Sequence, residues 1–386
     1  MPPSAAERLH VSFAWSSAGP APAADEIEVS VFGPGKGECI VLHVGSGRWV
    51  VVDSCIEPGD SWSVAERYLR GLGVALESQV DMVVATHWHD DHIGGIARLL
   101  EQCKAAQFAC SAAMSRTEFW QYVMQMGTGS LATDGAKVRE FTKVLAILES
   151  EHRLPLRAAT ESSELRTWPA NQMPHGERCL LRSFSPSDLE HQLFLQWLAT
   201  MNPAHMQPTR SAVDPEHNVT AVVLHLQFSS CSVLLGADME IHSDPRRGWA
   251  AVVATALARE AMPAAVNKVA HHGSSNGYLE EAWVKLLEAA PVSVVTPYNR
   301  LPDSRKLPTE NDVQRMRSRG RLLQTSPHAG TRIMTRDPGV ARGLRESNIE
   351  LRDMKGELGM VRFRRRLGAA STQWASELHG AAFEHP

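Results

Sequence analysis

The arrangement of apolar and polar residues along the chain predicts alternating strands and helices. Residues 26–33, EIEVSVFG, alternate with a period of two, which is typical of a half-buried strand. Residues 39–45 and 48–54 are apolar runs joined by Ser-Gly, and this pattern predicts a hairpin. Residues 80–86, VDMVVAT, form a continuous apolar run, as expected of a strand buried on both faces.

Helical patterns separate these strands. We expect helices at residues 63–74 and 93–103. Residues 111–207 have a mostly helical pattern and are expected to form a largely helical insertion, with helices at 115–126, 135–153 and 187–201 and a short strand at 180–184. Later elements are strands at 218–228, 231–239, 266–274, 292–298, 321–326 and 359–367, and helices at 248–260, 278–290 and 310–320.

This succession predicts one large domain at residues 27–369. Residues 1–26 are rich in Ala, Pro and Ser and are expected to be a flexible arm, and residues 370–386 a weakly ordered tail.

Composition narrows the class of protein. The chain has 386 residues, of which 43% are apolar, so it can bury a sizeable core. The net charge of -4 gives no general attraction to nucleic acid or to anionic membranes. The run RFRRRL at residues 362–367 fits either a phosphate-binding patch or a charged edge strand, and the mild acidity of the chain favours the edge strand.

The six cysteines are scattered without a CxxC pair, which is typical of reduced thiols in a cytoplasmic protein. Neither a signal-peptide pattern nor an apolar run of ~20 residues is found, so we expect no membrane partner.

The segment VVATHWHDDHIGG, Val83 to Gly95, carries the main chemical signal. It follows a buried strand and precedes a helix, and such strand ends carry the sites of open α/β sheets. Side chains at i and i+2 of an extended segment point the same way, so His87 and His89 can bind one ion together. Asp91 and His92 can bind a second ion beside it. Imidazole plus carboxylate suits zinc and, less exclusively, manganese or iron.

Two later strand ends complete this ligand set. Asp238 follows VLLGA, and His271 and His272 follow VNKVA. A two-metal site needs a bridging carboxylate and a further histidine, which Asp238 and one of the two histidines supply. Adjacent side chains on an extended segment point to opposite sides, so only one histidine is expected to face the metals.

The motif THWHDDHIGG resembles the signature of the metallo-β-lactamase-fold hydrolases. Asp53 after an apolar strand, Asp238 in GAD and the histidines in HHGS occur in the matching order. The resemblance covers roughly residues 26–326. It implies an α/β fold, a four-layer αβ/βα sandwich with a di-metal site at one edge.

Three further segments of this chain resemble two subgroups of these hydrolases. FGPGKGECIVLHVGSGRWVVVDS, HNVTAVVLHL and NKVAHHGSS resemble segments of the metallo-β-lactamase-like domains of DNA-uptake competence proteins and of phosphorylcholine esterases. Lys36 and Leu307 depart from the pattern of those domains, and no membrane channel is attached, which leaves substrate and partner open.

The resemblance also assigns roles. His87 and His89 are expected to bind the first metal, Asp91, His92 and His272 the second, and Asp238 both. This implies two Zn²⁺ per chain, with Mn²⁺ or iron as alternatives.

The remaining roles lie around these ligands. Many relatives have a further histidine ligand where this chain has Asn218. Either the first metal therefore has one nitrogen ligand fewer and is more open to a substrate oxygen, or His217 is the ligand instead. Asp53 orients a ligand by a hydrogen bond, or caps its strand. His271 acts on a leaving group or packs in the core. Ser274 and Ser275 offer donors for phosphate oxygens or cap a helix.

Taken together, these residues predict a hydrolase that uses a metal-bridging hydroxide. We expect Asp91, His271 and Asn218 to take part in catalysis, and a phosphodiester as the substrate, in a nucleic acid or in a small molecule. The same chemistry can hydrolyse a carboxylic ester, a lactone or a lactam. A non-catalytic, metal-stabilised interaction module is the third interpretation, although a structural zinc site is usually closed and tetrahedral.

Overall fold

The protein is described by a computed structural model. It describes residues 19–33, 37–57, 60–116, 119–120, 135–153, 155–200, 217–300, 305–328, 330–331, 354–355, 358–368 and 373–386. Most of the expected N-terminal arm, Lys36, and most of the expected helix at 115–126 lie outside these residues. The described residues 19–25 pack on the domain, since the Pro20 carbonyl accepts a hydrogen bond from Arg364 and the Asp25 carbonyl one from the Leu367 amide.

The first of two large sheets has eight strands in the order β19-β18-β1-β2-β3-β4-β5-β6. In chain order they are β1 (Glu26–Gly33), β2 (Cys39–His43), β3 (Trp49–Val52), β4 (Val80–Ala85), β5 (Gln107–Ser111), β6 (Arg157–Ala159), β18 (Gly359–Arg366) and β19 (Ala375–Gly380). The expected hairpin is present, since β2 and β3 pair antiparallel. Strands β3 to β6 then run parallel.

The second sheet also has eight strands, in the order β20-β15-β12-β11-β10-β9-β8-β7. They are β7 (Glu164–Trp168), β8 (Cys179–Ser183), β9 (Leu224–Gln227), β10 (Ser232–Leu235), β11 (Ala264–Lys268), β12 (Leu287–Val295), β15 (Arg321–Gln324) and β20 (Phe383–Glu384). Strands β10, β11, β12 and β15 run parallel. Two short ribbons lie apart from these sheets: β13 (Tyr298–Arg300) with β14 (Arg305–Leu307), and β16 (Gly330–Thr331) with β17 (Met354–Lys355).

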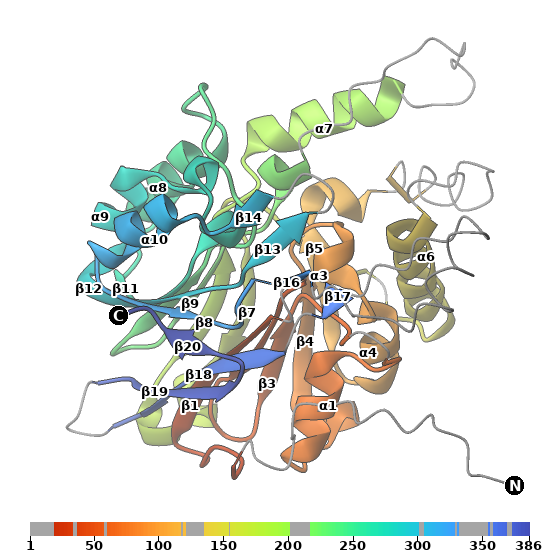
Figure 1. Ribbon diagram of the computed structural model, residues 1–386. Helices are drawn as coiled ribbons and strands as arrows, with labels where there is room; N and C mark the ends of the chain where they lie inside the picture. The colour runs from red at the N-terminus through yellow and green to blue at the C-terminus, as the bar shows by residue number, and fades with distance from the viewer. Residues whose placement is uncertain are drawn as a thin grey trace, which may run out of the picture.

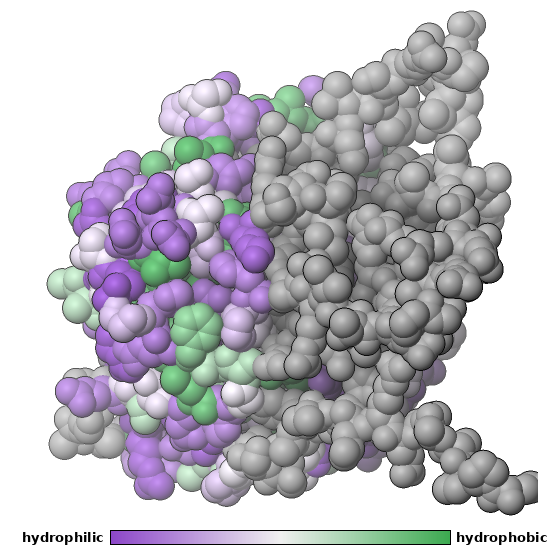
Figure 2. Space-filling view, viewed as in Figure 1, coloured by the Kyte–Doolittle hydropathy of each residue, from purple (hydrophilic) through white to green (hydrophobic). Residues whose placement is uncertain are grey.

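Helices cover the outer face of each sheet, so the domain has four layers (Figure 1). On the first sheet lie α1 (Val64–Gly71), α4 (Ile96–Gln102) and α6 (Gly135–Ser150), and on the second α8 (Gly248–Ala258), α9 (Glu280–Lys285) and α10 (Glu310–Arg317). Shorter or more distant helices are α2 (Leu76–Gln79), α3 (Asp90–Ile93) and α7 (Asp188–Thr200). The outer surface over α8, α9 and α10 is mostly hydrophilic (Figure 2).

The period of two along the strands produces this layering. In β3, Val50 and Val52 face the core between the sheets, while Trp49 and Val51 face α1 and α4. Strand β4 divides in the same way, with Met82 and Val84 inside and Val83 outside. Both faces of these strands are therefore apolar, which explains their continuous apolar sequences.

Residues 111–207 contribute to both sheets in addition to their helices. Helices α6 and α7 lie there as expected. Strand β6 extends the first sheet, and β7 and β8 form one edge of the second sheet. This segment therefore shares the core between the sheets, to which Leu165, Trp168 and Leu181 belong.

Three other expectations need correction. The tail at 370–386 is not weakly ordered where the structure describes it, because β19 pairs with β18 and β20 pairs with β15. The helix expected at 278–290 ends at Lys285, and the following residues belong to β12. Strand β5 was not predicted. Its residues QFACS alternate little between apolar and polar, because almost all of them are buried.

The arginine run belongs to β18, which is not an edge strand because β1 and β19 flank it. Arg364 donates to the buried Glu28 at 2.8 Å, Arg362 pairs with Glu377, and Arg365 donates to the Ser230 carbonyl at 3.3 Å. The expectation of an edge strand was therefore wrong. Arg362, Arg364 and Arg365 contact other parts of the fold, whereas the side chain of Arg366 is 63% exposed.

The carboxyl ends of β3, β4, β10, β11 and β12 meet at one edge of the two sheets, where the sequence places its candidate ligands. Among the described residues, no helix combines the length and the apolar character that crossing a bilayer requires. All six cysteines are buried and unpaired with one another.

Candidate metal centre

The loop after β4 and the short helix α3 together bring three histidines close to one another. His87 Nε2 lies 3.1 Å from His89 Nδ1, and the rings of His87 and His92 are 4.2 Å apart. His92 and His87 are fully buried. Backbone hydrogen bonds fix the loop, because the Ser54 amide donates to the His92 carbonyl at 2.7 Å and the Glu38 amide donates to the Asp91 carbonyl at 2.8 Å.

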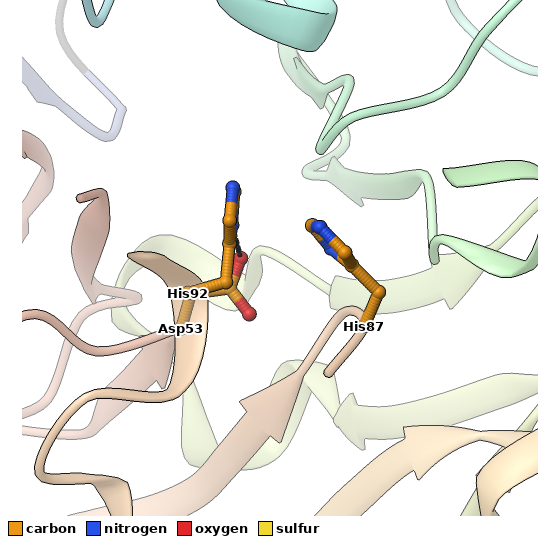
Figure 3. Close-up of side chains that lie close together, drawn as sticks. All are labelled: Asp53, His87 and His92. Atoms are coloured by element: carbon orange, nitrogen blue, oxygen red, sulfur yellow. Dashed lines mark hydrogen bonds and ion pairs between the residues drawn. The ribbon is translucent and has the colours of Figure 1, made fainter. Parts of the chain in front are cut away.

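Asp53 lies beneath this loop and orients His92 (Figure 3). Its Oδ2 accepts a hydrogen bond from His92 Nδ1 at 2.7 Å, so His92 Nε2 is left to face the centre. The backbone amide and hydroxyl of Thr86 each donate to Asp53 at 2.7 Å. The φ angle of Asp53 is 59°, a conformation that non-glycine residues rarely adopt. The hydrogen bond expected of Asp53 is therefore present in the structure.

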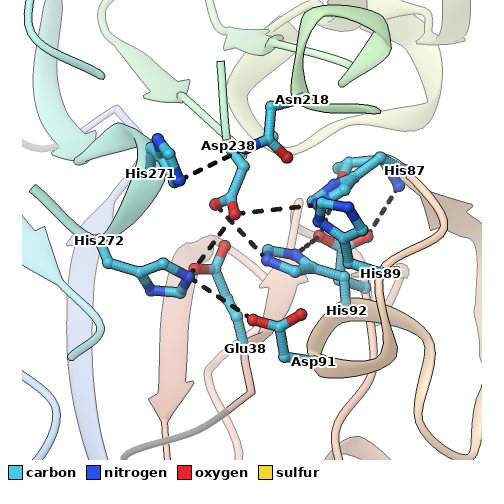
Figure 4. Close-up of polar contacts among 12 residues, drawn as sticks. Glu38, His87, His89, Asp91, His92, Asn218, Asp238, His271 and His272 are labelled. Atoms are coloured by element: carbon cyan, nitrogen blue, oxygen red, sulfur yellow. Dashed lines mark hydrogen bonds and ion pairs between the residues drawn. The ribbon is translucent and has the colours of Figure 1, made fainter. Parts of the chain in front are cut away.

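Asp238 comes from the second sheet, three residues after β10, and lies between the two groups of ligands (Figure 4). Its Oδ2 is 3.9 Å from His87 Nε2 and 3.6 Å from His272 Nε2. Its Oδ1 is 3.5 Å from His92 Nε2. This position between the groups is the one a bridging carboxylate would take.

His272 faces the same centre. Its Nε2 is 3.7 Å from Asp91 Oδ2, while its Nδ1 is 3.0 Å from the Thr296 carbonyl. His271 and His272 have φ angles of 45° and 52°. The extended conformation expected for this pair is therefore wrong, and the two imidazoles separate because each residue lies in a left-handed turn.

His271 is directed toward Asn218, away from the candidate ligands (Figure 4). Its Nδ1 is 3.1 Å from Glu240 Oε1, and Asn218 Nδ2 donates to the same oxygen at 2.6 Å. Asn218 Nδ2 also lies 3.3 Å from His271 Nε2. His217 begins the short 3₁₀ turn His217–Thr220, and its side chain lies outside the description.

The residues present fit metal ions. Ligand atoms lie within 4.8 Å of one another in four groups: His87, His89 and Asp238; Asp91, His92 and His272; Glu38, His92 and Asp238; and Asp53, His87 and His92. His92 Nε2, His272 Nε2 and Asp238 Oδ1 are buried and have no hydrogen-bond partner among the described residues. Buried polar atoms need partners, and one or two cations would satisfy these at once.

The pKa values of His92 and His272 show that the cluster favours positive charge. Burial by itself disfavours a charged imidazole, but the carboxylates of Asp238 and Asp53 hold the pKa of His92 well above its usual range. Burial also opposes the charging of His272, while Asp238 and Asp91 raise its pKa to about 9. The carboxylates thus favour positive charge nearby, which protonated imidazoles or divalent cations can supply.

The structure adds residues that the sequence interpretation did not select. Glu38, Lys268 and Thr296 form a buried polar network beside His272 and His92, and Glu240 contacts His271. The GKGEC segment before β2 was a signal for Glu38, because it contains a charged residue directly before a buried strand. Glu240 stands two residues after Asp238, but nothing in its local pattern indicates a contact with His271.

A pocket of about 620 Å³ opens beside His271. Ser274, Ser275, Asn276 and Tyr298 line it, together with Thr309 at the start of α10 and Arg315 within that helix. Its volume is within the range of small-molecule sites. Tyr298 stacks on the ring of His272 with centroids 4.9 Å apart, so the pocket adjoins the ligands directly.

Comparison with known proteins supports the class of fold. Residues 32–145 match the family model described as the metallo-beta-lactamase superfamily. This range contains β2 to β5 and the loop with His87, His89, Asp91 and His92. The two mixed sheets with their helical layers are consistent with the αβ/βα sandwich of the metallo-β-lactamase fold.

Among solved structures, the chain is similar to the metallo-beta-lactamase fold protein YhfI from Bacillus subtilis. The TM-score is 0.38 at 11% identity, over 76% of this chain and 93% of that chain. A search of curated proteins finds no match.

Proposed function

We propose that the protein is a di-metal hydrolase that cleaves phosphodiesters. The observation that carries this proposal is the convergence of His87, His89, Asp91, His92, Asp238 and His272 at one edge of the sheets, with buried nitrogen and oxygen atoms facing one another. Members of the superfamily matched by residues 32–145 are mostly metal-dependent hydrolases. Two bound cations, Zn²⁺ first and Mn²⁺ or iron as alternatives, would supply Lewis acidity and lower the pKa of a water molecule.

The residues around the ligands support the remaining steps. Asp53 holds His92 in the orientation that presents Nε2 to the centre. Glu240 Oε1 lies 3.1 Å from His271 Nδ1, and His271 lines the pocket with 19% of its side chain exposed. An imidazole at this position can give a proton to the leaving oxygen of a substrate. Asn218 holds Glu240 in turn, and its own Oδ1 is buried without a hydrogen-bond partner among the described residues.

The choice of a phosphodiester rests on the pocket. Ser275 and Asn276 line it together with Ser274, whose hydroxyl donates to Asn276 Oδ1, and Arg315 lines it from α10. Hydroxyl and amide donors suit phosphoryl oxygens, on which charge accumulates during transfer. The resemblance to DNA-uptake competence domains and to phosphorylcholine esterases favours the same substrate class.

The test is an activity screen of the purified protein. We expect hydrolysis of bis-p-nitrophenyl phosphate, loss of activity after chelation and its return with Zn²⁺ or Mn²⁺. Single-stranded DNA, RNA and small phosphodiesters in the same assay separate a nuclease from a small phosphodiesterase. Asp238→Ala is the inactive control, and Asp244→Ala, a carboxylate at the surface of the following loop, is the matched active control.

Two results would contradict the proposal. Faster turnover of lactones or carboxylic esters than of every phosphodiester would assign the centre to carbonyl substrates. No turnover of any substrate by the metal-restored protein would leave a metal-stabilised interaction module as the better interpretation.

A further inference from the structure

We propose that Glu38 is a further oxygen ligand of the metal centre and that it raises the affinity of the His92 side of the centre for Mn²⁺ more than its affinity for Zn²⁺. This inference rests on the proposed di-metal function. Glu38 belongs to the loop before β2, on a segment distant in sequence from every other ligand. Figure 4 shows its carboxylate among Asp91, His92 and His272, directed into the centre.

The two oxygens of Glu38 have different surroundings. Oε2 accepts a hydrogen bond from Thr296 Oγ1 at 2.7 Å and pairs with the ammonium group of Lys268. Oε1 is buried and has no hydrogen-bond partner among the described residues. Glu38, His92 and Asp238 nevertheless bring ligand atoms within 4.8 Å of one another. An unsatisfied carboxylate oxygen at this position is costly unless a cation binds it.

Lys268 explains how a further carboxylate is tolerated there. Its side chain is 0% exposed, and its ammonium group also donates to the Ala237 carbonyl at 3.3 Å. Ala237 precedes Asp238 and has a left-handed φ of 45°. Lys268 therefore connects Glu38 to the turn that presents Asp238, and offsets one negative charge without occupying Oε1.

The type and number of ligands on the His92 side indicate which metal ion would bind there. With Glu38, the His92 side has two imidazoles, from His92 and His272, and carboxylates from Asp91, Asp238 and Glu38. Catalytic zinc sites usually have three protein ligands. Oxygen-rich sets with more ligands suit manganese. The structure thus combines a His-rich position at His87 and His89 with an oxygen-rich position around Glu38.

The test compares metal affinities of the full chain after removal of bound metal. Mn²⁺ and Zn²⁺ are titrated separately against a fluorescent chelator, and elemental analysis gives the stoichiometry. Glu38→Gln is expected to weaken Mn²⁺ binding at one of the two positions by at least about tenfold, the lower limit for losing even an indirect partner of a metal. Zn²⁺ affinity should change less. The matched control is Glu28→Gln, a buried glutamate held by Arg364 and Tyr68 in the first sheet.

A double variant separates a ligand from a structural ion pair. Glu38→Gln leaves Lys268 buried without its carboxylate and lowers stability, whereas Glu38→Gln with Lys268→Met removes both charges. If Glu38 is a ligand, the double variant regains thermal stability but not Mn²⁺ affinity. The proposal is overturned if the double variant binds Mn²⁺ as the wild type does, or if Glu38→Gln folds and binds it unchanged. A wild-type protein that binds less than one equivalent of either metal would instead overturn the proposed di-metal function.

Discussion

The two halves of the candidate centre are built in different ways. The first sheet supplies His87, His89, Asp91 and His92 from a single loop, so these ligands are neighbours in sequence before any folding takes place. The second sheet supplies Asp238 and His272 from separate loops, which meet only when β10 and β11 pair. The first half is a local motif, whereas the second half is a product of the tertiary structure.

Backbone strain is distributed unequally between these halves. In the first half, Asp53 is the one non-glycine residue discussed that has a positive φ, and it contacts the ligand segment through His92 and Thr86. In the second half, Ala237, His271 and His272 all have positive φ angles directly at the site. Such conformations cost of order 1–3 kcal/mol each and persist when surrounding contacts enforce them. The second half therefore depends more on the packing of its sheet.

The largest expected effect comes from the residue that joins the two halves. Asp238→Ala should remove activity and reduce bound metal from about two equivalents per chain to less than one, because Asp238 approaches ligands of both groups. His89→Ala should lose metal from one position only. Elemental analysis of protein purified without chelator measures both. Normal metal content and turnover in Asp238→Ala would show that the halves function without this connection.

The histidine pair tests the second half alone. His272→Ala should lower metal content and activity together, because His272 Nε2 faces Asp91 and Asp238. His271→Ala should retain metal and reduce kcat by roughly 10²–10⁴-fold, the effect of losing an acid–base group. Parallel kinetics and metal analysis of the two variants provide the measurement. Metal loss in His271→Ala but not in His272→Ala would reverse the assignment.

A smaller effect is expected beneath the local motif. Asp53→Asn keeps the size of the side chain but weakens the hydrogen bond that orients His92. Metal affinity or activity should fall by about 10–100-fold, as for other partners of metal-bound histidines. Competition with a chelator measures the dissociation constant of the more weakly bound metal ion, which should increase in this variant. An unchanged constant would mean that packing alone orients His92.

The smallest effect is expected away from the centre. Ser63 caps α1, and its hydroxyl accepts a hydrogen bond from the Glu66 amide at 3.1 Å. Ser63→Ala should lower the free energy of unfolding by about 1 kcal/mol and leave metal content unchanged. Thermal unfolding and elemental analysis of the same sample test this. Loss of metal would show that the first half is less self-contained than its local sequence indicates.

The sequence predicted much of the first half because its signals are local. The hairpin of β2 and β3, the buried strand β4 and the ligand loop each lie within a short segment whose pattern is sufficient to identify it. Asp238 and His272 were found as well, because each directly follows an apolar strand. In the structure Asp238 lies near both His87 and His272, and the role of each residue as a metal ligand stays a prediction.

Other features could not be predicted because they depend on distant contacts. Glu38 and Lys268 pair across the two sheets, and neither residue type indicates burial by itself. Glu240 acquires its significance only when the turn at His271 brings an imidazole beside it. Strands β19 and β20 gain their order from β18 and β15, since their own sequences are weakly apolar and half exposed.

The pairing of β1 with β18 has a consequence for synthesis of the chain. Strand β1 lies between β2 and β18, so one edge of this N-terminal strand stays unpaired until residues 359–366 have been made. The unpaired edge belongs to a strand with Ile27, Val29 and Val31 on one face, and exposed apolar edges recruit other chains. Nascent or truncated chains that lack β18 are therefore expected to aggregate and to depend on chaperones, even though they already contain every candidate ligand of the proposed metal centre.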